Sequence, residues 1–184
     1  MSGHTLYFAY GSNMSQARLA ARIPSASKLI AAELMGFVLA FNKPGMDGSA
    51  KGNLLRTGNP IDSVWGVVYQ IDSAALPLLD RIEGDGYIRR TVAVYLDDIR
   101  LEVQTYLATQ VQTDLKPFTW YKRHVLTGAR ENSLPAAHIR YISSVKAIKD
   151  PKLPRHNMEV GLYHDGTETP LVNSLAPARA SVGF

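Results

Sequence analysis

The sequence predicts a mixed α+β domain built around a curved or partly closed β-sheet. Short segments rich in aromatic and β-branched residues recur between residues 4 and 108, whereas helical patterns are few before Pro117. The sequence contains no internal repeat and no long low-complexity stretch. With 184 residues, 46% of them hydrophobic, the chain is long enough to form one domain with a real core.

The first part of the chain alternates predicted strands with turns. Four segments have the composition of strands, namely residues 4–10, 34–42, 54–58 and 63–71. A short helix follows the first of them, because Asn13 or Ser15 can cap its start and Pro24 helps to end it. The glycine-rich residues 43–53 indicate a loop, and the turn sequence GNPID separates the last two strands.

The second part begins with a predicted helix at residues 74–83, which has Pro77 in its first turn. Residues 88–96 and 99–108 are predicted to form a β-hairpin around Asp97 and Asp98. Two helical patterns follow, at residues 118–132 and 134–150. Beyond Pro151 the periodicity is weak. We therefore expect one domain over residues 1–150 and an irregular C-terminal extension over residues 151–184.

Charge and composition exclude several classes of function. The net charge is +4, with an isoelectric point of about 9.3. Lys and Arg are scattered among acidic residues, and the group at 146–155 fits a solvated helix end and tail, so we expect no nucleic-acid partner. An anionic small molecule suits the mildly positive surface. No segment is long and apolar enough to span a membrane, and no secretory signal is visible, so we expect a cytoplasmic protein.

Residue types also restrict the chemistry. The chain has no cysteine, and therefore no disulfide, thiol nucleophile or thiolate metal site. Its five histidines show no close paired spacing, and no serine-nucleophile, phosphate-loop or dinucleotide motif occurs. We expect neither a metal nor a cofactor.

The stretch YGSN (10–13) is the first candidate for a binding site. Gly11 lies where a strand turns into a helix, so a ligand could approach the backbone closely there. Successive N–H groups in such a turn and the start of a helix both favour a bound carboxylate. The alternative is a plain turn that Asn13 or Ser15 caps.

Glu83 is the second candidate, at the end of a predicted helix and just before Gly84. A carboxylate there meets the negative end of the helix dipole, at a cost of roughly 0.3–1 kcal/mol. The same field raises its pKa and makes it a better proton acceptor near neutral pH. The alternative is an exposed glutamate in a polar turn. Two phenols, Tyr87 and Tyr121, can each offer a hydrogen bond at the rim of a pocket.

Together these stretches resemble the γ-glutamylcyclotransferase family, which includes AIG2-like proteins. LYFAYGSNM resembles its N-terminal strand and turn, and SVWGVVYQI followed by LLDRIEG resembles its central strand and the helix that carries the catalytic glutamate. YKRHVLTGARENSLP resembles a later helical segment that supplies a tyrosine. The resemblance implies a small mixed, barrel-like β-sheet with flanking helices.

The resemblance also implies roles for particular residues. Glu83 would be the proton acceptor, Tyr121 would contact the substrate and Asn13 would support the turn. The loop that binds the γ-glutamyl group would consist of Tyr7, Phe8, Ala9, Tyr10, Gly11 and Ser12. Members of the family release 5-oxoproline from a small γ-glutamyl substrate, and because the nucleophile is the substrate's own amine, the reaction requires no metal or cofactor.

Two alternatives remain open at this stage. Within the enzyme class, the leaving group is an amino acid, a peptide or an amine. A leaving group with a carboxylate needs a facing cation, for which we name Arg81, Arg89, Lys122 and Arg123. Outside the enzyme class, the chain is a binding or interaction module that retains the pocket without turnover. The sequence does not predict the oligomeric state.

Overall fold

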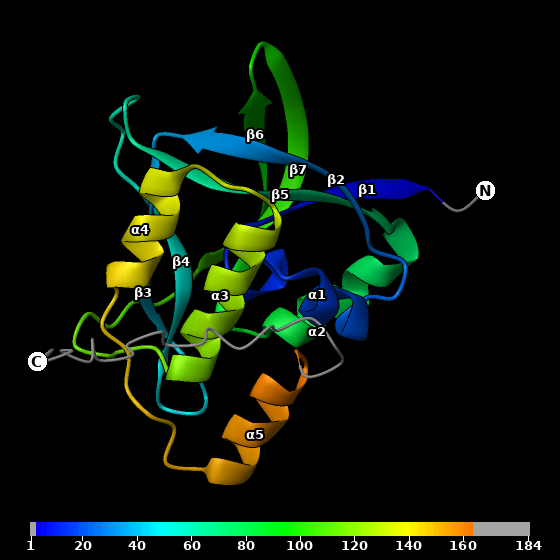
Figure 1. The fold of residues 1–184 in the computed structure, drawn as a ribbon. Coiled ribbons are helices and arrows are strands. Elements are labelled where there is room, and N and C mark those ends of the chain that lie inside the picture. The colour runs from blue at the N-terminus through cyan, green and yellow to red at the C-terminus, as the bar shows by residue number, and fades with distance from the viewer. Residues whose placement is uncertain (1–2, 164–184) are drawn as a thin grey trace, which may run out of the picture.

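The centre of the protein is a closed β-barrel, which confirms the predicted α+β fold (Figure 1). The computed structural model describes residues 3–163. Around the barrel the strand order is β1, β5, β2, β6, β7. Their bounds are β1 (His4–Ala9), β2 (Ser27–Met35), β5 (Ser63–Asp72), β6 (Tyr87–Leu96) and β7 (Ile99–Ala108). A separate two-stranded sheet consists of β3 (Phe37–Pro44) and β4 (Ala50–Arg56).

Strand β1 closes the barrel by pairing on both of its edges. It runs antiparallel to β5, with Tyr7 opposite Tyr69, and parallel to β7, with Tyr7 opposite Gln104. Alternate side chains point inward, and Phe8, Val68 and Val103 are almost completely buried. The strand that leads into the YGSN turn is therefore held on both sides by backbone hydrogen bonds.

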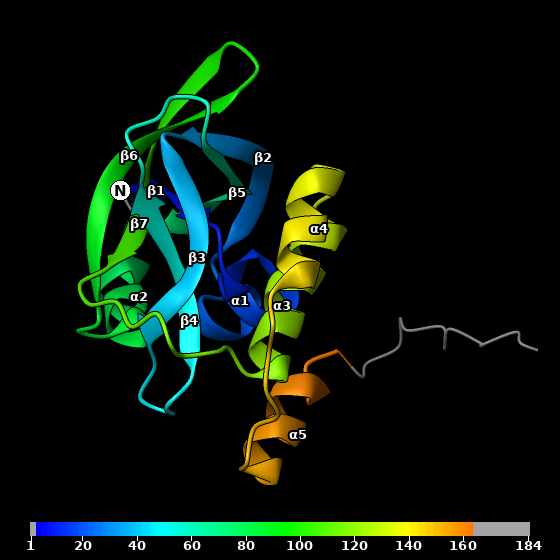
Figure 2. The same cartoon turned by 90° about the vertical axis from the view of Figure 1, so that its left-hand side faces the viewer.

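The helices flank the sheets. They are α1 (Gln16–Arg22), α2 (Leu76–Glu83), α3 (Thr119–Glu131), α4 (Ala136–Ser144) and α5 (Leu153–Gly161), with short 3₁₀ turns at Ser12–Met14 and Ser73–Ala75. Figure 2 shows α3, α4 and α5 on one side of the molecule and the barrel on the other. Ser15 caps α1, as expected, by accepting a hydrogen bond from the Arg18 N–H.

Several predicted elements are confirmed and others are displaced. The first strand, the helix ending at Glu83, the hairpin around Asp97 and the helix after Pro117 are all present. The predicted strand at 34–42 spans two strands, because Gly36 with φ of 78° turns the chain between β2 and β3. The predicted loop at 43–53 contains the start of β4, and α4 ends at Ser144 rather than near residue 150.

The expectation of an irregular segment after Pro151 is wrong for Leu153–Gly161, which forms α5. A proline in the first turn suits a helix start, so Pro154 does not oppose it. Contacts with distant residues hold this helix, as described below. Residues 164–184 of the predicted extension lie outside the described residues. Within residues 3–163, no helix is both long enough and apolar enough to cross a membrane.

Candidate active site

Glu83 is the last residue of α2, and the following Gly84 ends the helix with φ of 73°. Its half-buried carboxyl group lines two adjoining spaces, a small inner pocket and an outer cavity of about 520 Å³. Burial raises the pKa of the Glu83 carboxyl, while the charges of Arg22 and Lys43 lower it. The group is thus a better proton acceptor than an exposed glutamate.

Asn13 fixes the position of the Glu83 carboxylate. Its amide nitrogen donates to Glu83 Oε1 at 2.8 Å and to the Tyr7 hydroxyl at 3.1 Å. Its amide oxygen accepts a hydrogen bond from Arg22 Nη1 at 3.0 Å. Asn13 was expected to support the turn; in the structure its side chain connects the turn to the carboxylate on α2.

The inner pocket brings together most of the predicted site residues. Tyr7, Tyr10, Gly11 and Ser12 line it with Glu83 and Tyr121. Phe8 and Ala9 do not line it, because their side chains are buried in the wall of the barrel, at 0% and 1% exposure. Alternate residues of β1 face opposite sides, which turns Phe8 away from the side of Tyr7.

Tyr121 reaches the same pocket from α3 and binds the backbone of β4. Its hydroxyl accepts a hydrogen bond from the Gly52 N–H at 2.8 Å, and the Tyr87 hydroxyl donates to the Gly52 carbonyl at 2.5 Å. A Cβ atom on Gly52 would lie 3.2 Å from the Tyr121 hydroxyl oxygen. The absence of a side chain at Gly52 therefore leaves room for the Tyr121 hydroxyl against β4.

The phenols of the pocket are neutral hydrogen-bonding groups. Burial, and after it the charge of Glu83, raises the pKa of Tyr7 and Tyr10 well above the ordinary value. The Tyr10 hydroxyl donates to the Tyr106 carbonyl at 2.6 Å, and the Tyr106 hydroxyl donates to Asp80 at 2.7 Å. These bonds hold the aromatic walls of the pocket in place.

Cations surround the outer cavity, but they are mostly not the ones that we named. Of those four, Arg81 lines the cavity. Arg89 pairs with Asp80, and Lys122 donates to the carbonyls of Ser143 and Val145. Arg123 lies over the Tyr163 ring. The other basic residues that line the cavity are Arg18, Arg22, Lys43 and Lys51.

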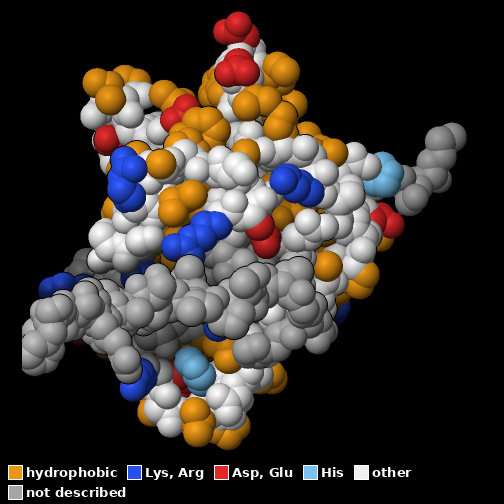
Figure 3. All heavy atoms as spheres, in the orientation of Figure 1, with side chains coloured by type: hydrophobic (Ala, Val, Ile, Leu, Met, Phe, Trp, Pro, Cys, Tyr) orange, Lys and Arg blue, Asp and Glu red, His pale blue; other side chains and the backbone are white. Residues whose placement is uncertain are grey.

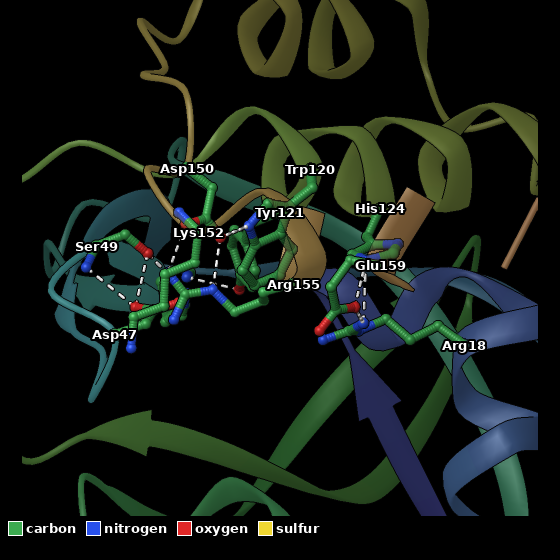
Figure 4. A network of polar contacts seen from close by, with 12 residues as sticks. Arg18, Asp47, Ser49, Trp120, Tyr121, His124, Asp150, Lys152, Arg155 and Glu159 are labelled. Carbon is green, nitrogen blue, oxygen red and sulfur yellow. Dashed lines mark hydrogen bonds and ion pairs between the residues drawn. The ribbon is translucent and has the colours of Figure 1, made fainter. Parts of the chain in front are cut away.

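Helix α5 is joined to this region by a buried polar network (Figure 4). Glu159 accepts a hydrogen bond from Arg18, and the same oxygen lies 2.9 Å from His124 Nε2. Burial lowers the pKa of His124 to about 4. Burial raises the pKa of Glu159, but the His124 hydrogen bond and the Arg18 charge outweigh it and lower the pKa to about 2. In the same view, Arg155 binds both oxygens of Asp150, which also accepts a hydrogen bond from Trp120.

Sequence reasoning missed Gly52, Tyr106, Lys43 and the arginines of α1 as lining residues. Gly52 and Lys43 lie in the predicted loop at 43–53, and Tyr106 lies in the predicted strand at 99–108. Neither pattern marks these residues as part of a site. Nothing in their local sequence links them to Glu83, since only the packing of the barrel against the β3–β4 sheet and α1 brings them together. The spacing of Arg18 and Arg22 by four residues, which places them on one face of a helix, was the one available signal.

The charges on one face of the protein (Figure 3) agree with the prediction of scattered basic residues, whereas five cations among the described residues gather around the outer cavity. Where side chains are visible on the face in Figure 3, Lys and Arg occur at separate positions. Within residues 3–163, no three His, Asp or Glu side chains are grouped as a metal site would require.

The chain is similar to known proteins over most of its length. An AIG2-like family model matches residues 63–142. The human γ-glutamylcyclotransferase is 33% identical over 157 residues, covering 78% of each chain, and the bovine protein is 32% identical over 148 residues, covering 77% of this chain and 78% of the relative. A solved γ-glutamyl cyclotransferase structure superposes with a TM-score of 0.74 and 29% identity, covering 79% of this chain and 90% of the other. The chain therefore belongs to the γ-glutamylcyclotransferase family.

Proposed function

We propose that this protein releases 5-oxoproline from a small γ-glutamyl compound, with Glu83 as the general acid and base. The observation that carries the proposal is the position of Glu83. Its half-buried carboxyl group has a raised pKa and accepts a hydrogen bond from Asn13. It lies where the inner pocket adjoins the outer cavity. The family relationship supports the same activity.

The reaction begins at the substrate's α-ammonium group. Glu83 removes one proton, and the amine nitrogen then attacks the γ-carbonyl carbon of the same molecule. A new C–N bond closes the five-membered lactam, and the bond from the γ-carbon to the leaving nitrogen breaks. The proton held by Glu83 passes to that nitrogen. The attacking nitrogen also gives up its second proton, which ends on the released amine, so 5-oxoproline and an ammonium leave and Glu83 returns to the carboxylate.

The pocket contributes by holding the glutamyl chain in a curled conformation. Well-oriented intramolecular reactions reach effective molarities of roughly 10⁵–10⁸ M, so positioning supplies much of the rate. Backbone N–H groups of Tyr10, Gly11 and Ser12 are proposed to bind the α-carboxylate or to polarise the γ-carbonyl. Tyr121 is proposed to bind the substrate from the opposite wall.

The test is 5-oxoproline release from a panel of γ-glutamyl amino acids, peptides and amines. We expect Glu83→Gln to lower kcat by at least about a hundredfold, because the shape is kept and only the base is lost. Glu102→Gln is the matched control, since Glu102 is an exposed carboxylate on β7. Turnover by Glu83→Gln at nearly the wild-type rate would remove Glu83 from the mechanism. No release from any substrate by the folded wild type would favour the binding module.

A further inference from the structure

Most cations around the outer cavity already have protein partners. Arg18 binds Glu159, and Arg22 donates to Asn13. Lys51 donates to Asp47 and to Ser49, both at 2.7 Å. Carboxylates thus pair with the charges of Arg18 and Lys51, and Arg22 is held towards Asn13. Arg81, which also lines the cavity, is exposed to solvent.

Lys43 differs from them. It is only 8% exposed, yet within residues 3–163 its ammonium group makes neither a hydrogen bond nor an ion pair. Its nitrogen lies 4.7 Å from the centre of the Tyr87 ring, a cation–π contact. Glu83 is near enough for the two charges to interact, but it does not pair with the ammonium. A buried ammonium that makes no hydrogen bond is costly, so this arrangement suits a site that a ligand completes.

The side chain of Lys43 is also held in one direction. A Cβ atom on Gly86 would lie 2.5 Å from Lys43 Cε and 2.6 Å from Nζ, so the lysine passes directly over the Gly86 backbone. The Tyr87 ring supports it, and the hydroxyl of that ring is fixed by the Gly52 carbonyl. The charge is thus pre-positioned, which lowers the entropic cost of binding an anion.

The location of Lys43 indicates which part of the substrate it meets. Lys43 lines the outer cavity but not the inner pocket, whereas Glu83 lines both. If the glutamyl group occupies the inner pocket, the leaving group extends past Glu83 into the outer cavity. A carboxylate there would face Lys43 at the wall.

We propose that Lys43 is a specificity-determining residue that binds the carboxylate of the leaving group. Lys43 then favours a leaving group that carries a carboxylate over an uncharged leaving group of the same shape. This inference rests on the proposed function, since it concerns the leaving group of that reaction.

The experiment combines one substitution with two substrates. γ-Glutamyl-alanine and γ-glutamyl-alaninamide differ in the charge of the leaving group and little in its shape. We expect Lys43→Met to lower kcat/KM for the alanine compound about 10- to 100-fold, because a charge-assisted hydrogen bond is lost. For the alaninamide compound the change should stay below about threefold, since it has no carboxylate to bind. The ratio of the two effects cancels differences in leaving-group basicity.

Two further variants complete the design. Lys43→Gln keeps a polar group without the charge and should show the same substrate-dependent loss, should Lys43→Met fold poorly. Lys116→Met removes an exposed lysine outside the cavity and controls for net charge. An equal loss for both substrates would overturn the role of Lys43 and would indicate an effect on Glu83 instead. No 5-oxoproline from either substrate with wild type would overturn the proposed function, and this inference with it.

Discussion

The amide of Asn13 donates a hydrogen bond to Glu83 Oε1 at 2.8 Å, although the two residues are 70 positions apart in the chain. The same amide nitrogen donates to Tyr7, and the amide oxygen accepts from Arg22. The amide nitrogen thus makes two hydrogen bonds and the amide oxygen one, so the carboxylate on α2 is connected to the turn after β1. The base and the binding turn thus act as one rigid unit.

Substitution of Asn13 tests this connection. We expect Asn13→Ala to lower kcat about 10- to 100-fold, because the carboxylate loses its orientation. The hydrogen bond favours the ionised form and lowers the pKa of Glu83, so its removal raises that pKa. The acidic limb of the kcat/KM profile should therefore move to higher pH. Asn59→Ala, at an exposed turn residue, is the control; an unmoved limb in Asn13→Ala would contradict the positioning role.

Tyr121 has a structural partner as well as a proposed substrate contact. In Tyr121→Phe the buried Gly52 N–H loses its acceptor, so the free energy of unfolding should fall by about 1–3 kcal/mol. KM should rise more than kcat falls, because one substrate hydrogen bond is lost. Urea denaturation and steady-state kinetics measure the two effects.

The control for Tyr121 is Tyr141→Phe. That hydroxyl donates to the Leu39 carbonyl at 2.5 Å, and the residue is 45% exposed and lines neither of the two adjoining spaces. Its loss should leave KM unchanged. A KM that is equal in Tyr121→Phe and wild type would remove Tyr121 from the substrate site.

The Glu159 contact provides a test of how α5 is held. Glu159→Gln should lower the free energy of unfolding by about 1–3 kcal/mol at pH 7, because Arg18, which is 5% exposed, loses its anionic partner. Glu102→Gln, in the exposed pair with Arg100, should cost less than about 1 kcal/mol. Equal effects of the two substitutions would show that the α5 contact contributes little to stability.

This difference should depend on pH. The folded-state pKa of Glu159 is lowered to about 2 from 4.5, so on acidification the unfolded chain takes up the proton first. The stabilisation is present above pH 4.5 and is lost as the pH falls towards 2. The difference in the free energy of unfolding between wild type and Glu159→Gln should therefore become smaller over that range. Denaturation at several pH values would measure it.

The sequence by itself determined the elements whose signals are local. The aromatic strand before YGSN, the helix that ends at Glu83 and Gly84, and the hairpin at Asp97 are all encoded by neighbouring residues. Periodicity, proline and glycine act over a few residues, so the sequence alone predicts these elements. The order of the motifs was also sufficient to indicate the family.

Only the tertiary structure decided which of these residues meet. The fold places Phe8 and Ala9 in the wall of the barrel. It brings Lys43 and Glu83 to the outer cavity and Gly52 to the inner pocket beside Glu83. Helix α5 forms where sequence periodicity is weak, because Asp150, Arg18 and His124 hold its residues. Contacts between residues far apart in the chain depend on strand register and closure of the barrel, and no local pattern in the sequence records them.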